Sequence, residues 1–307
     1  SMSESIRTVL RENAGKMKPG DVFVVNAPYN GGTHLPDVTV ITPIFDDAAE
    51  EILFFVASRG HHADIGGITP GSMPPDSKVV EEEGILFDNF LLVDGGDFLE
   101  DKLRKHLADH PYPARNPDHN VADLKAQIAA GEKGVQEVRK MIEQFGLDVV
   151  HAYMRHVQDN AEEQVRRVID VMQDGEFSYP TDEGAEIKVK ISFNKKERSA
   201  SVDFTGTSAQ RPSNYNAPSA VARSAVLYVF RCLIDDNIPL NEGCLKPINI
   251  IIPEGCMLAP KYPAAVVAGN VETSQVVTDT LFGALGVLAA SQGTMNNVTF
   301  GNESFGY

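Results

Sequence analysis

Apolar residues recur every three to four positions over three stretches of the chain, and this spacing predicts three amphipathic helices. The first covers residues 3–17, with Ser3 suited to the N-cap and Gly15 near the C-terminal end. Two longer stretches, residues 120–146 and 150–172, are separated only by a short break around Gly146. We expect these two long helices to form an antiparallel hairpin in the middle of the chain. Their apolar positions are Val121, Leu124, Ile128, Val135, Val138, Ile142, Phe145, Val150, Met154, Val157, Ala161, Val165, Val168 and Met172.

Strand-like segments rich in β-branched and aromatic residues occupy both ends of the chain. Three of them, residues 21–26, 38–45 and 51–58, lie close together near the N-terminus. Apolar and polar residues alternate over residues 187–193 and 199–205, which predicts a β-hairpin. Residues 220–234 and 274–290 are expected to be helices, and residues 248–253 a strand. Because strands and helices do not alternate regularly, we predict an α+β fold with mixed sheets.

The same pattern suggests three regions along the chain. Residues 1–110 form a strand-rich region that carries polar loops, residues 111–180 the helical hairpin, and residues 181–307 a second α+β region. The alternative is that all three regions belong to a single domain.

Charge and cysteine content narrow the classes of partner and the compartment. The chain has 27 basic and 43 acidic residues and a net charge of −16, which disfavours nucleic acid and anionic membranes as partners. Its 3 cysteines form no CxxC pair, which favours a reducing compartment. No apolar stretch is long enough to span a bilayer, and the N-terminus does not resemble a secretory signal. We therefore expect a cytoplasmic protein.

Two glycine-flanked loops hold the most informative polar side chains. The loop at residues 26–37 contains Gly31 and Gly32 followed by His34 and Asp37, in the motif GGTHLPD. The loop at residues 58–77 contains three further candidates in the motif RGHHADIGG, namely His61, His62 and Asp64. Imidazole and carboxylate groups together are ligands for zinc, manganese or non-haem iron. A catalytic acid–base cluster and a merely polar turn are the alternatives.

Other polar residues are candidates for proton transfer or substrate binding. One of the glutamates at 81–83 could complete a metal site or act as a general base, although a run of charges is also typical of a solvated surface. The side chains of Asn214, Asn270 and Thr273 could bind an amide or a carboxylate, or could instead cap helices. The sequence contains no phosphate-binding GxxxxGK[ST] motif and no GxSxG nucleophile elbow.

Taken together, these motifs resemble the hydantoinase B family, which includes part of the ATP-dependent 5-oxoprolinases and, more distantly, the acetone carboxylase large subunit. The stretches that carry the resemblance are residues 20–45, 54–75, 240–255, 264–286 and 291–302, and they are spread over nearly the whole length of the chain. One departure is Ala27, where the family commonly has aspartate. Both ends resemble positions inside the family's domain, so the chain is expected to be a truncated domain that is inactive alone.

The resemblance implies a divalent metal ion, with manganese, zinc and iron as candidates. Its ligands would be Asp37, His61 and Asp64, with His34 and His62 in reserve. Protons would be moved by His62 or by Glu83. The cyclic substrate would be bound by Asn214, Asn270 and Thr273.

The function implied is the metal-bearing half of an ATP-dependent hydrolase that opens 5-oxoproline or a hydantoin. Its partner would be an actin-like ATPase half, hydantoinase A, which would use the ATP, and the assembly is expected to be oligomeric. Two alternatives stay open. One is a ketone carboxylase subunit like that of acetone carboxylase, and the other is a non-catalytic scaffold for the ATPase.

Overall fold

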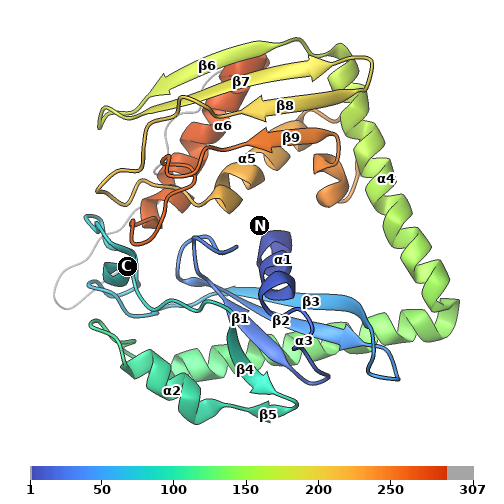
Figure 1. The fold of residues 1–307 in the computed structure, drawn as a ribbon, viewed down its shortest axis with the longest axis vertical. Coiled ribbons are helices and arrows are strands. Elements are labelled where there is room, and N and C mark those ends of the chain that lie inside the picture. The colour runs from blue at the N-terminus through green and yellow to red at the C-terminus, as the bar shows by residue number, and fades with distance from the viewer. Residues whose placement is uncertain (1, 289–307) are drawn as a thin grey trace.

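Two β-sheets with their own helices lie one above the other, and a long helix runs between them along one side (Figure 1). The structure is a computed structural model that describes residues 2–288. We call the part built on the first sheet the N-terminal lobe and the part built on the second sheet the C-terminal lobe. The expected α+β fold, with two long central helices and two late helices, is confirmed.

The sheet of the N-terminal lobe has the strand order β3-β2-β1-β4-β5, and its strands are antiparallel. The strands are β1 (Val22–Val25), β2 (Asp37–Phe45), β3 (Ile52–His61), β4 (Phe90–Asp94) and β5 (Asp97–Phe98). Strand β1 is apolar throughout because both of its faces are covered. Val22 and Val24 belong to the same core as residues of α3 (Pro117–Phe145), whereas Phe23 and Val25 pack with Val9 of α1 (Met2–Glu12). Side-chain alternation along the strand thus separates two cores. A further helix, α2 (Glu100–Ala108), packs against α3.

The sheet of the C-terminal lobe has the order β6-β7-β8-β9, in which only β8 and β9 are parallel. The strands are β6 (Gly175–Pro180), β7 (Glu186–Asn194), β8 (Ser199–Asp203) and β9 (Ile248–Ile251). The predicted hairpin corresponds to β7 and β8, and its alternating residues Ile187, Val189 and Ile191 are buried. They share a core with α5 (Ser219–Cys232) and α6 (Glu272–Leu285). Three short 3₁₀ helices complete the described part of the fold: η1 (Val80–Glu82), η2 (Glu242–Leu245) and η3 (Val267–Asn270). Of the helix predicted over residues 274–290, the last two residues lie outside the described part of the chain.

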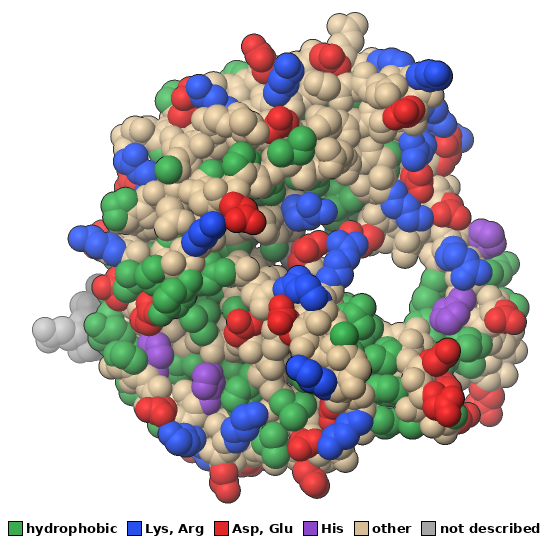
Figure 2. Space-filling view, viewed as in Figure 1, with side chains coloured by type: hydrophobic (Ala, Val, Ile, Leu, Met, Phe, Trp, Pro, Cys, Tyr) green, Lys and Arg blue, Asp and Glu red, His purple; other side chains and the backbone are tan. Residues whose placement is uncertain are grey.

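The two long central helices, α3 and α4 (Leu147–Val171), follow each other directly and are joined at Gly146. The predicted hairpin is therefore present as consecutive helices, but its arms diverge instead of lying antiparallel (Figure 1). The reason is that each helix has a different partner. Helix α3 packs on β2 and β3, whereas α4 contacts η2, α5 and β8 of the other lobe. At the corner between α3 and α4, apolar side chains line a pocket of about 730 Å³, beside an opening that is visible in the space-filling view (Figure 2).

Candidate functional site: a His–Asp–His group beside a pocket between the lobes

The first feature of the site is a group of three side chains at the ends of two adjacent strands. Asp37 begins β2 and stands directly opposite His61, the last residue of β3. Their side chains interact, with Asp37 Oδ1 2.9 Å from His61 Nδ1. His34 lies in the loop before β2, and its Nδ1 is 3.3 Å from the second oxygen of Asp37. One ligand atom from each residue can be chosen so that all three lie within 4.8 Å of one another.

The loop that carries His34 can fold so tightly because of its glycines. Gly31 has φ +86°, and a Cβ atom on Gly32 would lie 2.1 Å from the carbonyl oxygen of Asn26. No side chain can be placed there without moving the backbone. The Gly32 N–H donates to the Ala27 carbonyl at 2.8 Å, which closes the turn. The prediction that glycines allow this loop to turn tightly is confirmed at Gly31 and Gly32.

Electrostatic interactions within the group keep Asp37 ionised. Burial alone would raise the pKa of Asp37, but its interactions with His34 and His61 outweigh burial and hold that pKa well below the usual range. Conversely, the hydrogen bond with Asp37 raises the pKa of His61, although partial burial opposes this. Asp37 is therefore an anionic oxygen donor between two imidazoles.

These residues fit a divalent metal ion. His34 is buried, and its Nδ1 atom has no hydrogen-bond partner, although it lies near Asp37. A buried polar atom without a partner is costly, and a metal ion would satisfy it. Two imidazoles and one carboxylate also match the ligand set of manganese, zinc or iron sites. Because the His61 side chain is 54% exposed, the group is open on one side.

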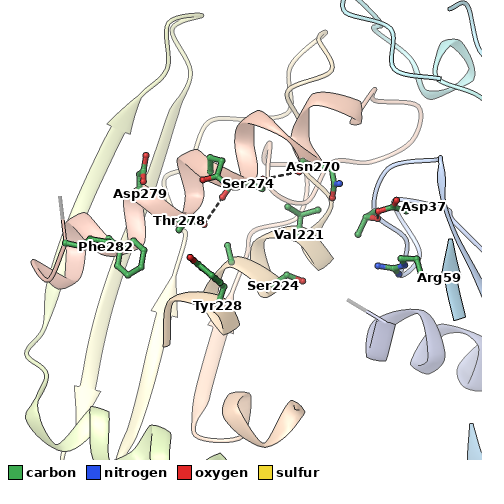
Figure 3. A pocket seen from close by; sticks show the side chains of 14 residues that line it. Asp37, Arg59, Val221, Ser224, Tyr228, Asn270, Ser274, Thr278, Asp279 and Phe282 are labelled. Carbon is green, nitrogen blue, oxygen red and sulfur yellow. Dashed lines mark hydrogen bonds between the residues drawn. The ribbon is translucent and has the colours of Figure 1, made fainter. Parts of the chain in front are cut away.

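A cavity of about 570 Å³ lies beside this group, between the two lobes. The N-terminal lobe contributes Thr33, Asp37 and Arg59 to its lining, and the C-terminal lobe contributes residues of α5 and α6 and of the turn before α6. Figure 3 shows Asp37 and Arg59 at one end and Asp279 and Phe282 at the other. Of the predicted substrate-binding residues, Asn270 lines this cavity, on the side that faces Asp37 (Figure 3).

Arg59 is a residue of this pocket that was not predicted from the sequence. It lies on β3 two positions before His61, and both side chains point to the same face of the sheet. Its Nε donates to Thr39 Oγ1 at 2.8 Å, and its Nη2 donates to Ser5 Oγ at 3.1 Å. The alternation of side chains along a strand would have placed Arg59 on the same face as His61 if the strand predicted over residues 51–58 had been extended to His61.

Asp64 and His62, two other predicted residues, lie away from the group. The Asp64 carboxylate accepts hydrogen bonds from the backbone N–H groups of Gly66, Gly71 and Arg115, and pairs with the Arg115 guanidinium at 2.8 Å. These bonds outweigh the effect of burial and lower the pKa of Asp64. Asp64 thus joins its loop to the segment before α3, and it is not one of the three clustered ligands.

His62 is buried on the opposite face of the sheet from His61, against α3. Its Nε2 is 3.1 Å from Gln127 Oε1 and its Nδ1 is 3.1 Å from Asn120 Nδ2. Burial lowers the pKa of His62. Both ring nitrogens therefore bond to side chains of α3, and His62 does not line the pocket.

The remaining predicted residues make hydrogen bonds between segments of the fold. Glu83 is fully buried and accepts hydrogen bonds from Ser77 Oγ and from the backbone N–H groups of Val266 and Val267. Asn214 donates to the carbonyls of Pro74 and Pro75, each at 2.9 Å. Both residues join the two lobes.

Thr273, the last predicted substrate-binding residue, donates to the Tyr215 carbonyl at 2.6 Å within the C-terminal lobe.

The buried Glu83 side chain has a shifted pKa. Burial raises the pKa of Glu83 to about 7 even though Glu83 accepts several hydrogen bonds.

The fold and the site define a two-lobed α+β protein with a His–Asp–His group at the edge of a pocket between the lobes. The family model described as hydantoinase B/oxoprolinase matches residues 1–307, so the chain belongs to this family. The sequence is 45% identical over 334 residues to 5-oxoprolinase 1 of Arabidopsis thaliana, which covers 100% of this chain and 26% of that protein. The chain therefore spans about a quarter of the length of that relative.

Two solved structures share the fold. An ATP-dependent caprolactamase from Pseudomonas jessenii superposes with a TM-score of 0.78 at 23% identity, over 92% of this chain and 50% of that one. A nucleotide-free acetone carboxylase superposes with a TM-score of 0.77 at 17% identity, over 92% of this chain and 39% of that one. The described residues contain no helix that is long and apolar enough to cross a membrane.

Proposed function

We propose that this chain is the metal-bearing half of an ATP-dependent hydrolase that opens a cyclic amide, either 5-oxoproline or a hydantoin. The observation that carries the proposal is the His34–Asp37–His61 group at the edge of the pocket between the lobes. The identity to 5-oxoprolinases over the whole chain supports the reaction class.

In this proposal His34, Asp37 and His61 hold the metal ion. A bound divalent ion would polarise the amide carbonyl and lower the pKa of water, which together contribute several kcal/mol to catalysis. This revises the ligand set that the family resemblance implied, because His34 takes the place of Asp64. Asp64 already has Arg115 and three backbone N–H groups as partners.

The chain's own residues would bind and orient the ring. Asn270 faces Asp37 across the pocket and carries both a donor and an acceptor, so its side chain could bind the ring amide. The lobes would shield the ring from bulk water on two sides. His62 and Glu83 are the predicted proton carriers, but both are hydrogen-bonded outside the pocket lining, so we assign them to supporting the fold.

ATP would be used by a partner half of the hydantoinase A type, in the cytoplasm. Two observations support a partner: the 5-oxoprolinase relatives are about four times longer than the matched region, and this sequence lacks a phosphate-binding GxxxxGK[ST] motif. A lactam is a poor electrophile, and phosphorylation of its oxygen by the ATPase half would activate it.

The proposal is tested by combining the chain with its ATPase half and measuring the release of glutamate from 5-oxoproline in the presence of ATP and Mn²⁺ or Zn²⁺. We expect ATP-dependent ring opening that Asp37→Asn abolishes. The Asp97→Asn variant is a matched control, because Asp97 lies on the two-residue strand β5 at the far edge of the sheet.

Two other outcomes would contradict the proposal. Consumption of a ketone that requires bicarbonate would identify a carboxylase instead. Full ring opening by the Asp37→Asn complex would show that the chain is a scaffold for its partner.

A further inference from the structure

Arg59 is the one basic residue among the described residues that line the pocket between the lobes. The rest of the lining consists of hydroxyl, amide and apolar groups together with two aspartates, Asp37 and Asp279. Asp279 lies at the far end from Arg59 (Figure 3). Arg59 therefore carries the one basic group of this described lining, at the same end of the pocket as Asp37.

No carboxylate in the described part of the chain forms an ion pair with Arg59. Its two hydrogen bonds go to the uncharged hydroxyls of Thr39 and Ser5. Other arginines of the N-terminal lobe do have carboxylate partners, for example Arg104 with Glu100 and Arg115 with Asp64. Burial lowers the pKa of Arg59, and the negative charge of the nearby Asp37 offsets this only in part. A partly buried guanidinium whose hydrogen bonds go to hydroxyls alone is unfavourable, and an anionic ligand would reduce that cost.

The distance between Arg59 and the His–Asp–His group sets the size of an anionic molecule that could reach both. Arg59 and His61 lie two residues apart on the same face of β3, which corresponds to about 7 Å along the strand. A five-membered ring with a carboxylate beside its amide has similar dimensions. Such a molecule could reach Arg59 with its carboxylate and the His–Asp–His group with its amide carbonyl.

We propose that Arg59 binds the carboxylate of the cyclic amide, so that the pocket selects an anionic ring such as 5-oxoproline over a neutral ring such as a hydantoin. This inference rests on the proposed function for the identity of the reacting group, and it decides between the two substrates left open there. A guanidinium presents paired donors that match the two oxygens of a carboxylate.

The experiment measures binding without ATP, in the complex of the chain with its ATPase half. Titration calorimetry compares 5-oxoproline with 2-pyrrolidinone, which is the same ring without the carboxylate. We expect the wild-type complex to bind 5-oxoproline more tightly by roughly 10- to 100-fold, the range for a hydrogen-bonded charged group. Arg59→Gln should abolish this difference, and Arg59→Lys should retain part of it.

A matched control is Arg223→Gln, which removes an arginine that does not line the pocket and that lies 3.6 Å from Glu4. This variant should retain the preference for 5-oxoproline. A second control, Ser5→Ala, removes the hydrogen bond from Arg59 and the one that Ser5 donates to the Gly31 carbonyl, without changing the charge. It shows whether the loss in Arg59→Gln comes from displaced contacts of α1.

Equal binding of the two rings by the wild type, or an unchanged preference in Arg59→Gln, would overturn the inference. Binding of inorganic phosphate that depends on Arg59, without any preference between the rings, would also overturn it and would assign Arg59 to a phosphoryl group. The failure of ring opening in the assay above would instead reject the proposed function, because the binding experiment requires no turnover.

Discussion

At the scale of single residues, two neighbouring histidines have different environments because their side chains point to opposite sides at the end of β3. His61 pairs with Asp37 at the pocket, whereas His62 is buried against Gln127 and Asn120 of α3. The same alternation brings Arg59 to the pocket face. Chemical character at this strand end therefore depends on the direction in which each side chain points, as well as on residue type.

The metal ligands can be tested by single substitutions. We expect His34→Ala and His61→Ala each to lower the affinity for Mn²⁺ or Zn²⁺ by at least about 10-fold, because each removes one nitrogen donor. The measurement is metal content by elemental analysis after equilibrium dialysis. Asp64→Asn serves as the comparison, since it removes the charge that pairs with Arg115 but leaves the three clustered ligands intact. Loss of metal from Asp64→Asn and retention in His34→Ala would support the ligand set implied by the family resemblance instead.

At the scale of elements, the site depends on how one loop enters β2. The loop from Asn26 to Pro36 turns at Gly31 and Gly32 and delivers His34 and Asp37 to the same point. Strand β2 then pairs with β3 over its whole length, so the register of that pair determines that Asp37 meets His61. A shift of one residue would move His61 to the other face of the sheet.

Adding a single methyl group at Gly32 should disrupt this loop. The Cβ atom of Gly32→Ala would lie 2.1 Å from the Asn26 carbonyl oxygen, so the backbone must move. We expect the free energy of unfolding to fall by about 2 kcal/mol and metal binding to weaken with it. Gly131→Ala in α3 is the control, because its nearest neighbour would be at an ordinary 3.5 Å. That variant should be as stable as the wild type or more stable by up to about 1 kcal/mol in denaturant unfolding. Equal stability of the two variants would contradict the steric argument.

At the scale of the whole molecule, two lobes with separate cores share one pocket. The larger C-terminal core is formed by buried side chains from the range 161–284, and the N-terminal cores by buried side chains from the range 9–124. Besides helix α4, the segment from Pro74 to Glu83 joins the lobes. Hydrogen bonds connect this segment to Asn214 and to residues 263–267 of the C-terminal lobe. The pocket lies between the lobes, so its shape depends on these contacts.

Glu83 should make this junction sensitive to pH. Its pKa is raised from 4.5 to about 7 by burial, so the folded state holds the proton more tightly than the unfolded state does. Stability should therefore fall as pH rises from 4.5 to 7 and level off above that, by about 3 kcal/mol from this group. Glu83→Gln is neutral at every pH and should lack this component. The measurement is denaturant unfolding of wild type and Glu83→Gln at pH 5 and pH 8, and a difference that does not change with pH would contradict the assignment.

Removing the Glu83 side chain altogether has a different expected effect. Glu83→Ala leaves the backbone N–H groups of Val266 and Val267 without their acceptor in a buried region. We expect a loss of about 3 kcal/mol or more, and this loss should be present at both pH values. Stability equal to that of Glu83→Gln would show that the carboxylate does not hold the lobes together.

The sequence by itself determined the local features of this protein, because helix and strand periodicities are short-range. It predicted the long helices, the hairpin at residues 187–205, the glycine-dependent turn, and His34, Asp37 and His61 as candidate ligands. It could not separate these ligands from Asp64 or His62, since the strand was expected to end at Ser58 and continues to His61. Only the tertiary structure decided that Glu83 and Asn214 join the lobes, and that Asn270 and Arg59 face one pocket. Those contacts link residues more than 100 positions apart, and no local pattern encodes which distant backbone a buried polar group will meet.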